Sequence, residues 1–372
     1  MTPKHLIILG THGIPAKHGG FETCAEKLAL HMRGQEWDVT VYGQAQEASS
    51  YEWNGIHCIN LKKFKNGFLS YLNPLLLDLK AIWHSRRIKG VFLTLGYNTA
   101  LFNLLLWFYR RPQMINMDGM EWQRSKYKRW HEKAWLRFNE WCALRLADVA
   151  VADHDAISDY LRRQKPDAHI ITIANGADNI TTKDASINPL ADYDLQPFHY
   201  GLIIARPEPE NQILEMVQAW HEADTNWPLV ILGNYNQSNP YQRLVLEFAG
   251  EKIKFVGAIY DAFIVKSLRF YAGLYLHGHK VGGTNPSLVE AMAAGCLTIA
   301  HDNVYNRGVA KETALYFQDH LSLVKNINQN TNNETNQDLK QQTRNRHATH
   351  YTWFPILQHY QSALESLRQK PL

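Results

Sequence analysis

The chain has 372 residues, of which 45% are hydrophobic and 20% charged, a composition that fits a globular protein of two domains. Its four cysteines include no CxxC pair. This spacing supports neither a zinc site nor a disulfide framework, so we expect a reduced, cytoplasmic, metal-free protein. Residues 1–185 hold 24 Lys and Arg against 18 Asp and Glu, and the remainder holds 15 against 17. A basic first half favours an anionic partner, either nucleic acid or a membrane surface with acidic lipids.

The first ten residues predict a short strand and no signal peptide. That strand, at 5–9, opens into a glycine-rich loop, a helix from 21 to about 33 and a second strand at 39–42. This order is one βαβ unit of a doubly wound sheet. The loop has neither the GxGxxG nor the GxxxxGK(S/T) spacing, so it implies neither NAD nor a P-loop nucleotide. It is either a structural loop or a place where Gly19 and Gly20 let a substrate approach the backbone closely.

Polar side chains follow the next predicted strands, which lie at 56–61, 91–95, 114–117, 149–152 and 170–173. Asp118 and Glu121 come after strand 114–117, and His154 after strand 149–152. Because ligands of open α/β sheets bind beyond the carboxyl ends of the strands, Asp118 and Glu121 are candidates for catalysis or acceptor binding. Turn-forming acidic residues are the alternative. The longest apolar region, 91–109, is broken by polar residues and predicts a strand, a turn and a helix rather than a membrane span.

Segment 122–138 is basic and aromatic. It holds six Lys and Arg, one Glu, three Trp, a Tyr and a Phe at broadly helical spacing. One interpretation is a solvated basic helix whose tryptophans pack inward. The other is an interfacial element, in which cations such as Lys126 and the aromatic rings face lipid headgroups or a lipid diphosphate. No nucleic-acid-binding fold signature accompanies the helix, so we expect no nucleic acid partner.

The second half repeats the α/β rhythm after a polar, proline-containing linker at about 180–198. Its predicted strands lie at 200–205, 229–233, 254–256 and 273–276, with helices near 210–222, 240–249 and 261–268. Segment 322–342 is rich in Asn and Gln and predicts an exposed helix or a loosely ordered stretch, and 353–367 predicts a final amphipathic helix. We therefore expect one α/β domain at 1–185, a second at 186–345 and a helix within 346–372.

A glycine-rich loop leads into a helix at 282–295. Asn285 is the predicted N-cap, Pro286 occupies the first helical position, and Gly295 ends the helix. Such a junction presents backbone N–H groups and the positive end of the helix dipole, which favour phosphate. One turn further on, Glu290 can accept hydrogen bonds from two ribose hydroxyls. Phosphate and ribose together describe a nucleoside diphosphate, whereas the alternative is a plain turn followed by a solvated glutamate.

Arg206 follows directly after the predicted strand 200–205. A cation at the carboxyl end of a strand can neutralise a leaving diphosphate. Pairing with Glu208 or Glu210 is the alternative. Residues 257–260 follow another strand on the same rim, and Tyr260 can flank the base there.

Two motifs resemble one enzyme family. The string HGHKVGGTNPSLVEAMAAG at 277–295 resembles the donor-site signature of retaining glycosyltransferases of family 4, which have the GT-B fold. In that family an Arg is followed five residues later by Lys and two glutamates are separated by seven residues; here those positions hold Arg206, Asn211, Gly282 and Glu290. Lys280 can supply the second cation. The string GTHGIPAKHGGFET, within residues 8–23, resembles the N-terminal signature of a rhamnosyltransferase branch of that family.

The resemblance implies an α/β protein of two Rossmann-like domains that face each other across a cleft, with the last helix crossing back to the first domain. It implies transfer of L-rhamnose from dTDP-L-rhamnose to a lipid-diphosphate-linked saccharide, in assembly of lipopolysaccharide or capsule at the inner face of the cytoplasmic membrane. No metal or cofactor is expected, because a helix dipole and cations can stabilise the leaving group. The alternatives are a UDP-glucose or UDP-GlcNAc transferase, a nucleotide-sugar 2-epimerase, and a non-catalytic nucleotide-sugar-binding subunit.

The expected site residues fall into three groups. The catalytic candidates are Asp118, Arg206 and Glu290. The donor-binding candidates are Gly19, Gly20, Arg206, Asn211, Tyr260, His277, Lys280, Gly283, Thr284, Asn285, Ser287, Leu288 and Glu290. The acceptor-binding candidates are Phe21, Glu22, Thr23, Asp118, Glu121, Lys126 and His154.

Overall fold

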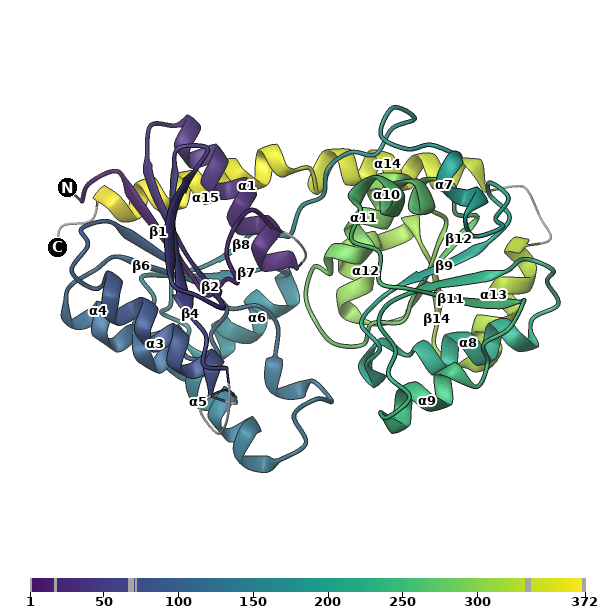
Figure 1. Ribbon diagram of the computed structural model, residues 1–372, viewed down its shortest axis with the longest axis horizontal. Coiled ribbons are helices and arrows are strands. Elements are labelled where there is room, and N and C mark those ends of the chain that lie inside the picture. The colour runs from purple at the N-terminus through teal and green to yellow at the C-terminus, as the bar shows by residue number, and fades with distance from the viewer. Residues whose placement is uncertain (1, 17–18, 66–69, 71, 332–335, 370–372) are drawn as a thin grey trace. The chain divides into compact units, whose positions relative to one another are not determined.

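The computed structural model in Figure 1 describes residues 2–16, 19–65, 70, 72–331 and 336–369. The chain divides into two compact units, each an α/β body. The first unit comprises Met1–Gln123, Tyr127–Asn175 and Trp353–Leu372, and the second comprises Arg124–Lys126 and Gly176–Thr352. The chain thus enters the second unit before the expected boundary at residue 185, and it returns to the first unit with the last helix.

The first unit is built on a sheet of eight strands in the order β3-β4-β2-β1-β5-β6-β7-β8. The strands are β1 (His5–Leu9), β2 (Asp38–Ala45), β3 (Ser49–Trp53), β4 (Ile56–Lys62), β5 (Val91–Leu95), β6 (Gln113–Asn116), β7 (Val149–Ala152) and β8 (Ile170–Thr172). All neighbours are parallel except β3 and β4. The central strands β1 and β5 are apolar over most of their length, as expected of a parallel sheet covered on both faces. The order reverses between β1 and β5, which makes that point the topological switch point of this sheet.

The helical elements of the first unit are α1 (Gly20–Gly34), α3 (Asn73–Ser85), η1 (Ala100–Asn103), α4 (Leu104–Phe108), η2 (Glu121–Gln123), α5 (Trp130–Leu146), α6 (Asp155–Gln164) and α15 (Trp353–Gln369). Helix α15 lies beside α1 (Figure 1). It belongs to this unit because its apolar side chains, among them Ile356, Tyr360 and Leu364, pack into the core that α1 covers. Burying each such side chain contributes about 1.5–3 kcal/mol. The hydroxyl of Tyr360 also accepts a hydrogen bond from the Asn116 amide at 3.2 Å, which ties the helix to the end of β6.

The second unit has a fully parallel sheet of six strands in the order β11-β10-β9-β12-β13-β14. They are β9 (Gly201–Ile204), β10 (Leu229–Leu232), β11 (Ile253–Gly257), β12 (Leu274–His277), β13 (Thr298–His301) and β14 (Leu315–Phe317). From β9 the chain moves one way to β10 and β11, and β12 starts again on the other side of β9. The switch point therefore lies between β9 and β12, where open α/β sheets bind their ligands.

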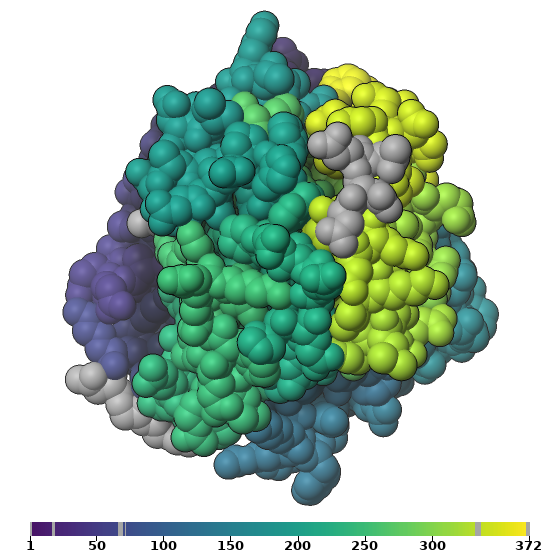
Figure 2. Space-filling view, turned by 90° about the vertical axis from the view of Figure 1, so that its right-hand side faces the viewer, coloured from purple at the N-terminus to yellow at the C-terminus, as the bar shows by residue number. Residues whose placement is uncertain are grey.

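The helical elements of the second unit are α7 (Asn188–Ala191), η3 (Pro209–Asn211), α8 (Ile213–Glu222), α9 (Pro240–Leu246), α10 (Ala262–Phe270), α11 (Pro286–Ala294), α12 (Val304–Ala310), η4 (Lys311–Thr313), α13 (His320–Thr331) and α14 (Gln337–His350). Helix α13 packs on α8, and α14 packs on α11. Figure 2 shows the face on which these late helices, in yellow, adjoin green and teal segments that come much earlier in the chain. They close the core of the unit, to which Leu323 and Ile327 contribute fully buried side chains.

The α/β fold class is confirmed, with two Rossmann-like units on parallel sheets. One local prediction is wrong. The basic helix does not begin at 122, because α5 starts only at Trp130, where the carboxylate of Glu132 accepts a hydrogen bond from the N–H of Arg129 at 3.1 Å. For the Asn- and Gln-rich segment the helix alternative is borne out, because its described part lies in α13 and α14; residues 332–335 are outside the described residues.

Candidate active site

Three segments meet at the switch point of the second unit: the turn after β9, the loop after β12 and the start of α11. The loop after β12 approaches the turn after β9 closely at Gly278, where an added Cβ would lie 2.4 Å from the carbonyl oxygen of Asn211. A side chain at position 278 would therefore push the two segments apart. The Lys280 N–H donates to the Glu210 carbonyl at 2.9 Å, which adds a main-chain link between the same segments.

The turn after β9 exposes Arg206. Among the described residues, its guanidinium makes no ion pair or hydrogen bond, so the alternative of pairing with Glu208 or Glu210 is not seen. Asn211 is only 3% exposed, and its amide donates to the Arg206 carbonyl at 2.8 Å. Asn211 therefore shapes the turn that carries Arg206, and its side chain is almost fully buried.

Lys280 lies at the opening of the loop after β12 and is exposed. Its ammonium lies 3.0 Å from the amide oxygen of Gln212, whose amide nitrogen donates to the Gly278 carbonyl at 2.9 Å. Gln212 adopts the left-handed conformation with φ +52°, which directs its side chain back toward this loop. The second cation of the region is therefore tethered beside the turn of Arg206.

Helix α11 begins and ends as predicted. The Asn285 side chain accepts a hydrogen bond from the Ser287 N–H at 3.0 Å, and Gly295 ends the helix in the left-handed conformation with φ +71°. The Leu288 N–H donates to the Asn285 carbonyl at 3.1 Å. The amides of Ser287 and Leu288 thus already have partners within the helix start, which makes the backbone at Gly283 the candidate for contact with phosphate.

Ser287 and Leu288 also have side chains that serve the fold. The Ser287 hydroxyl donates to the Ile204 carbonyl at 2.9 Å and contacts the Tyr275 hydroxyl, so it joins α11 to β9 and β12. Leu288 is fully buried in the packing of the helix, and Thr284 is buried as well. Tyr260, three residues beyond the end of β11, is by contrast exposed.

Glu290 is held by a cation that the sequence did not reveal. Nη2 of Arg269, on α10, lies 2.5 Å from Oε2 of Glu290, and the Arg269 side chain is 7% exposed against 39% for Glu290. The pair holds the carboxylate in one orientation while leaving part of it open to a ligand. Arg269 belongs to no motif recognised in the sequence, and only the packing of α10 on α11 brings it to Glu290.

In the first unit, the glycine loop after β1 is closed by the helix that follows it. Gly19, with φ +103°, precedes α1, and Gly20 is the first residue of that helix. The Glu22 carboxylate accepts a hydrogen bond from the His12 N–H at 2.9 Å, and the Thr23 hydroxyl donates to the Gly19 carbonyl at 2.9 Å. Phe21 packs toward Gly96 at the end of β5. Phe21, Glu22 and Thr23 therefore hold the loop at the switch point of this sheet.

The other acceptor candidates include residues at the ends of β6 and β7. Asp118 is partly exposed with φ +47°, and its N–H donates to the Asn116 side chain at 2.8 Å. Glu121 is 4% exposed, so its side chain is part of the interior. His154 is buried, and its Nδ1 accepts from the Ala156 N–H at 3.0 Å, which makes it the N-cap of α6. Lys126 is exposed.

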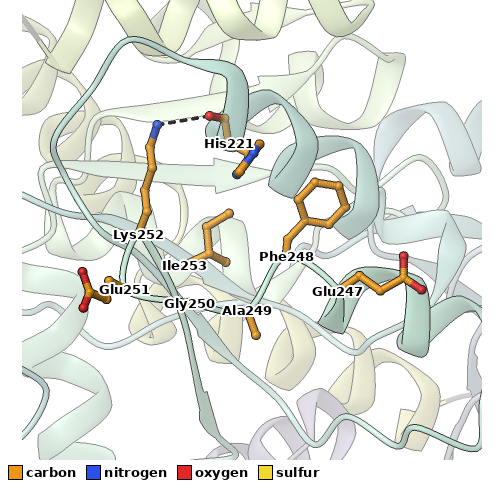
Figure 3. A pocket seen from close by; sticks show the side chains of 8 residues that line it. All are labelled: His221, Glu247, Phe248, Ala249, Gly250, Glu251, Lys252 and Ile253. Carbon is orange, nitrogen blue, oxygen red and sulfur yellow. Dashed lines mark hydrogen bonds between the residues drawn. The ribbon is translucent and has the colours of Figure 1, made fainter.

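A surface hollow of the second unit lies away from these residues. It has a volume of about 390 Å³ and is lined by His221 and residues 247–253 (Figure 3). The Lys252 ammonium beside it donates to the His221 carbonyl at 3.2 Å. Ile253 is the first residue of β11, so this hollow lies at the amino edge of the sheet, opposite to Arg206 and Glu290. It is not the expected donor site.

Within the described ranges, no three metal-ligating side chains are grouped to hold an ion. None of the helices there combines the length and the apolar character that a membrane crossing requires.

Two Rossmann-like units, with candidate ligand residues at the switch point of each sheet, define the GT-B class of fold. Residues 199–346 match the family described as glycosyl transferases group 1, and residues 3–178 match a family described as a domain of unknown function. No curated protein matches the chain. The family match and the structures below together support a glycosyltransferase of the GT-B fold.

Solved structures share this fold over nearly the whole chain. Sucrose-phosphate synthase from Thermosynechococcus elongatus has a TM-score of 0.81 at 18% identity, covering 98% of both chains. HepE of Anabaena, in complex with UDP and glucose, has a TM-score of 0.75 at 16% identity, covering 97% of this chain and 99% of its own. α,α-Trehalose 6-phosphate synthase from Burkholderia multivorans has a TM-score of 0.74 at 11% identity, covering 99% of this chain and 97% of its own.

Proposed function

We propose that the protein transfers a sugar from a nucleoside-diphosphate sugar to a hydroxyl of an acceptor saccharide. The observation that carries the proposal is the meeting of Arg206, the loop at 282–284 and Glu290 at the switch point of the second unit. The exposed guanidinium of Arg206 and the backbone of the loop take the diphosphate, and Glu290, oriented by Arg269, takes the ribose hydroxyls. As the bond between the sugar and the diphosphate breaks, negative charge grows on the diphosphate, where the Arg206 cation and a helix N-terminus stabilise it.

The proposed donor is dTDP-L-rhamnose and the proposed acceptor a lipid-diphosphate-linked saccharide, on the strength of the motifs at 8–23 and 277–295. UDP-glucose is the second candidate, because the structure of HepE, which shares the fold, has been determined with UDP-glucose. Asp118, at the carboxyl end of β6, is proposed to orient a sugar or to activate the acceptor hydroxyl.

A lipid-linked acceptor requires access to a membrane, and the first unit exposes a surface suited to it. We call it the aromatic–basic face; it consists of Trp83, Trp107, Phe108, Tyr109, Trp130, Trp135, Phe138 and Trp141, with Arg86, Lys133, Arg137 and Arg145. So many exposed large rings are unusual for a surface that meets only water. Rings and cations together match a surface of acidic lipid headgroups, so we propose peripheral contact with the inner face of the cytoplasmic membrane.

The residues of this face lie on three helices that are neighbours through η1 or the residues after α4. Helix α4 follows directly on η1, which packs against both α3 and α5. The Arg86 guanidinium lies 3.5 Å from the ring centre of Trp83 and 5.8 Å from that of Tyr109, which connects α3 to the end of α4. On α5 the rings of Phe138 and Trp141 stack with centroids 6.1 Å apart. The predicted basic segment at 122–138 is therefore only part of this face.

The proposal is tested by incubating the protein with dTDP-L-rhamnose, UDP-glucose or UDP-GlcNAc, each with and without a lipid-diphosphate-GlcNAc acceptor. Release of dTDP that depends on acceptor, together with a product heavier by one deoxyhexose, is the expected result. Release from a UDP-sugar alone would replace the donor but keep the reaction class. Conversion of the donor without acceptor would indicate an epimerase, and nucleotide binding without turnover of any donor would indicate a non-catalytic subunit.

A further inference from the structure

A pair of histidines stands at the end of β12, beside the proposed diphosphate site. The rings of His277 and His279 stack with centroids 4.3 Å apart and planes at 12°. Tyr275 continues the column, with its ring centroid 6.2 Å from that of His277. Alternate residues of a strand share one face, so the sequence Tyr-Leu-His-Gly-His places all three rings on the same side.

The backbone of His279 is fixed by two asparagines. Nδ2 of Asn303 donates to the His279 carbonyl at 2.9 Å, and Nδ2 of Asn306 donates to the same oxygen at 3.0 Å. Asn303 is the N-cap of α12, and Asn306 is almost fully buried. Two side-chain amides thus hold one carbonyl, which sets the position of the ring before any ligand arrives.

Three ring nitrogens of the pair have no partner in the described part of the chain. No hydrogen bond of normal geometry from those residues reaches Nδ1 or Nε2 of His277, or Nδ1 of His279, and all three atoms are buried. Buried polar atoms without a partner are uncommon in native proteins. His279 is only partly buried and its Nε2 is not among these buried atoms, whereas His277 is 1% exposed. A ligand can therefore reach Nε2 of His279 and cannot reach His277.

The charge state narrows the class of ligand. Burial lowers the pKa of His277 to about 3, and the nearby side-chain amide of Asn306 acts in the opposite direction. Burial, His277 and then Arg206 lower the pKa of His279 as well. Both rings are therefore neutral at physiological pH, and a neutral imidazole offers one donor and one acceptor. That pattern suits a sugar hydroxyl, which also donates and accepts, better than a phosphate, which only accepts.

We propose that His279 binds a hydroxyl of the donor sugar and contributes to sugar specificity, with His277 as the residue that positions its ring. The proposal rests on the function proposed above, in which Arg206 binds the diphosphate to which that sugar is attached. The space for the sugar is present beside Gly282, where an added Cβ would meet no atom within 4 Å.

The test compares nucleotide sugars with free nucleotides. Isothermal titration of wild type with dTDP, dTDP-L-rhamnose, UDP and UDP-glucose gives the ratio of affinities with and without the sugar. His279→Ala should weaken binding of the preferred nucleotide sugar by about fivefold to tenfold, since one hydrogen bond is lost, while binding of the free nucleotide stays unchanged. His279→Gln, which keeps a donor and an acceptor, should recover part of the loss.

Two further variants separate a binding role from a structural one. His277→Phe keeps a stacked ring without nitrogens and should retain most of the sugar-dependent affinity. His221→Ala, at the opposite edge of the same sheet, should leave every affinity unchanged. An unchanged ratio in His279→Ala would overturn the inference, as would an equal loss of free-nucleotide affinity. Failure of wild type to bind any nucleotide would instead overturn the proposed function.

Discussion

The ion pair between Arg269 and Glu290 predicts that its two members differ in their effect on stability. The Arg269 side chain is 7% exposed and that of Glu290 39%. Removing Glu290 leaves a buried guanidinium without its counter-charge, which costs about 3–5 kcal/mol when a pair is fully buried. Because water screens the exposed part of Glu290, we expect about 2 kcal/mol for Glu290→Ala. Arg269→Met keeps the apolar stem and leaves a carboxylate that water reaches, so we expect less than about 1 kcal/mol.

Thermal unfolding and nucleotide titration together check this reasoning. Glu290→Ala should lower the Tm of the second unit by about 4–8 °C, and Arg269→Met by less than about 4 °C. The double variant, which has no unpaired buried charge, should be more stable than Glu290→Ala alone. Nucleotide affinity should fall about tenfold or more in Glu290→Ala and remain low in the double variant, since a hydrogen bond to a charged group is lost. A larger stability loss in Arg269→Met than in Glu290→Ala would refute the assignment of Arg269 as the buried partner.

Three further predictions concern the diphosphate site, the aromatic–basic face and a buried carboxyl. Arg206→Ala should reduce turnover about a hundredfold or more, whereas Arg243→Ala, an exposed arginine on α9, should not; turnover within a few-fold of wild type would exclude the role of Arg206. Phe108→Ala should lower the affinity for acidic vesicles, measured by sedimentation, about fivefold. Phe354 is equally exposed at 66% but lies outside the aromatic–basic face, so Phe354→Ala is the matched control. Equal affinities of the two variants would contradict the proposed membrane contact. Burial raises the pKa of Asp78 to about 6, above its value in the unfolded chain. The contribution of this carboxyl to the free energy of unfolding is therefore fully present below about pH 4 and is lost as the pH rises through about 6. Asp78→Asn should therefore stabilise the protein at pH 7 by at most about 3 kcal/mol. The free energy of unfolding, measured in urea, should also depend less on pH between about pH 4 and 6 in this variant, and an unchanged dependence would contradict the prediction.

The sequence predicted the elements whose signals are local. Runs such as His5–Leu9 and Val91–Leu95 are apolar throughout most of their length and bounded by glycine, so the central parallel strands were predictable. Both ends of helix α11 were predicted correctly, because Asn285 and Pro286 act on the first turn of the helix and Gly295 acts on its last turn. Strand β3, at Ser49–Trp53, was missed because it lies at the edge of the sheet with mostly polar, exposed side chains.

The partners of the site residues depend on tertiary packing and could not be predicted. Arg269 reaches Glu290 only because α10 packs on α11, and neither residue carries a signal for the other. His154 is different: it directly precedes a helix whose first turn holds Asp155, and this local position is that of an N-cap. That signal was available in the sequence.

Three residues of the motif at 277–295 have structural contacts that shape the proposed donor site. Asn285 caps the helix, Ser287 joins it to β9, and Gly278 permits the close approach of the turn that carries Arg206. Each of these residues fixes the loop before a nucleotide binds, so less conformational freedom is lost on binding. A substitution at any of them would lower activity without removing a contact to the substrate. Loss of activity alone therefore does not identify a binding residue in this motif, and measurements that separate affinity from stability, as for Arg269 and Glu290, are needed to assign each role.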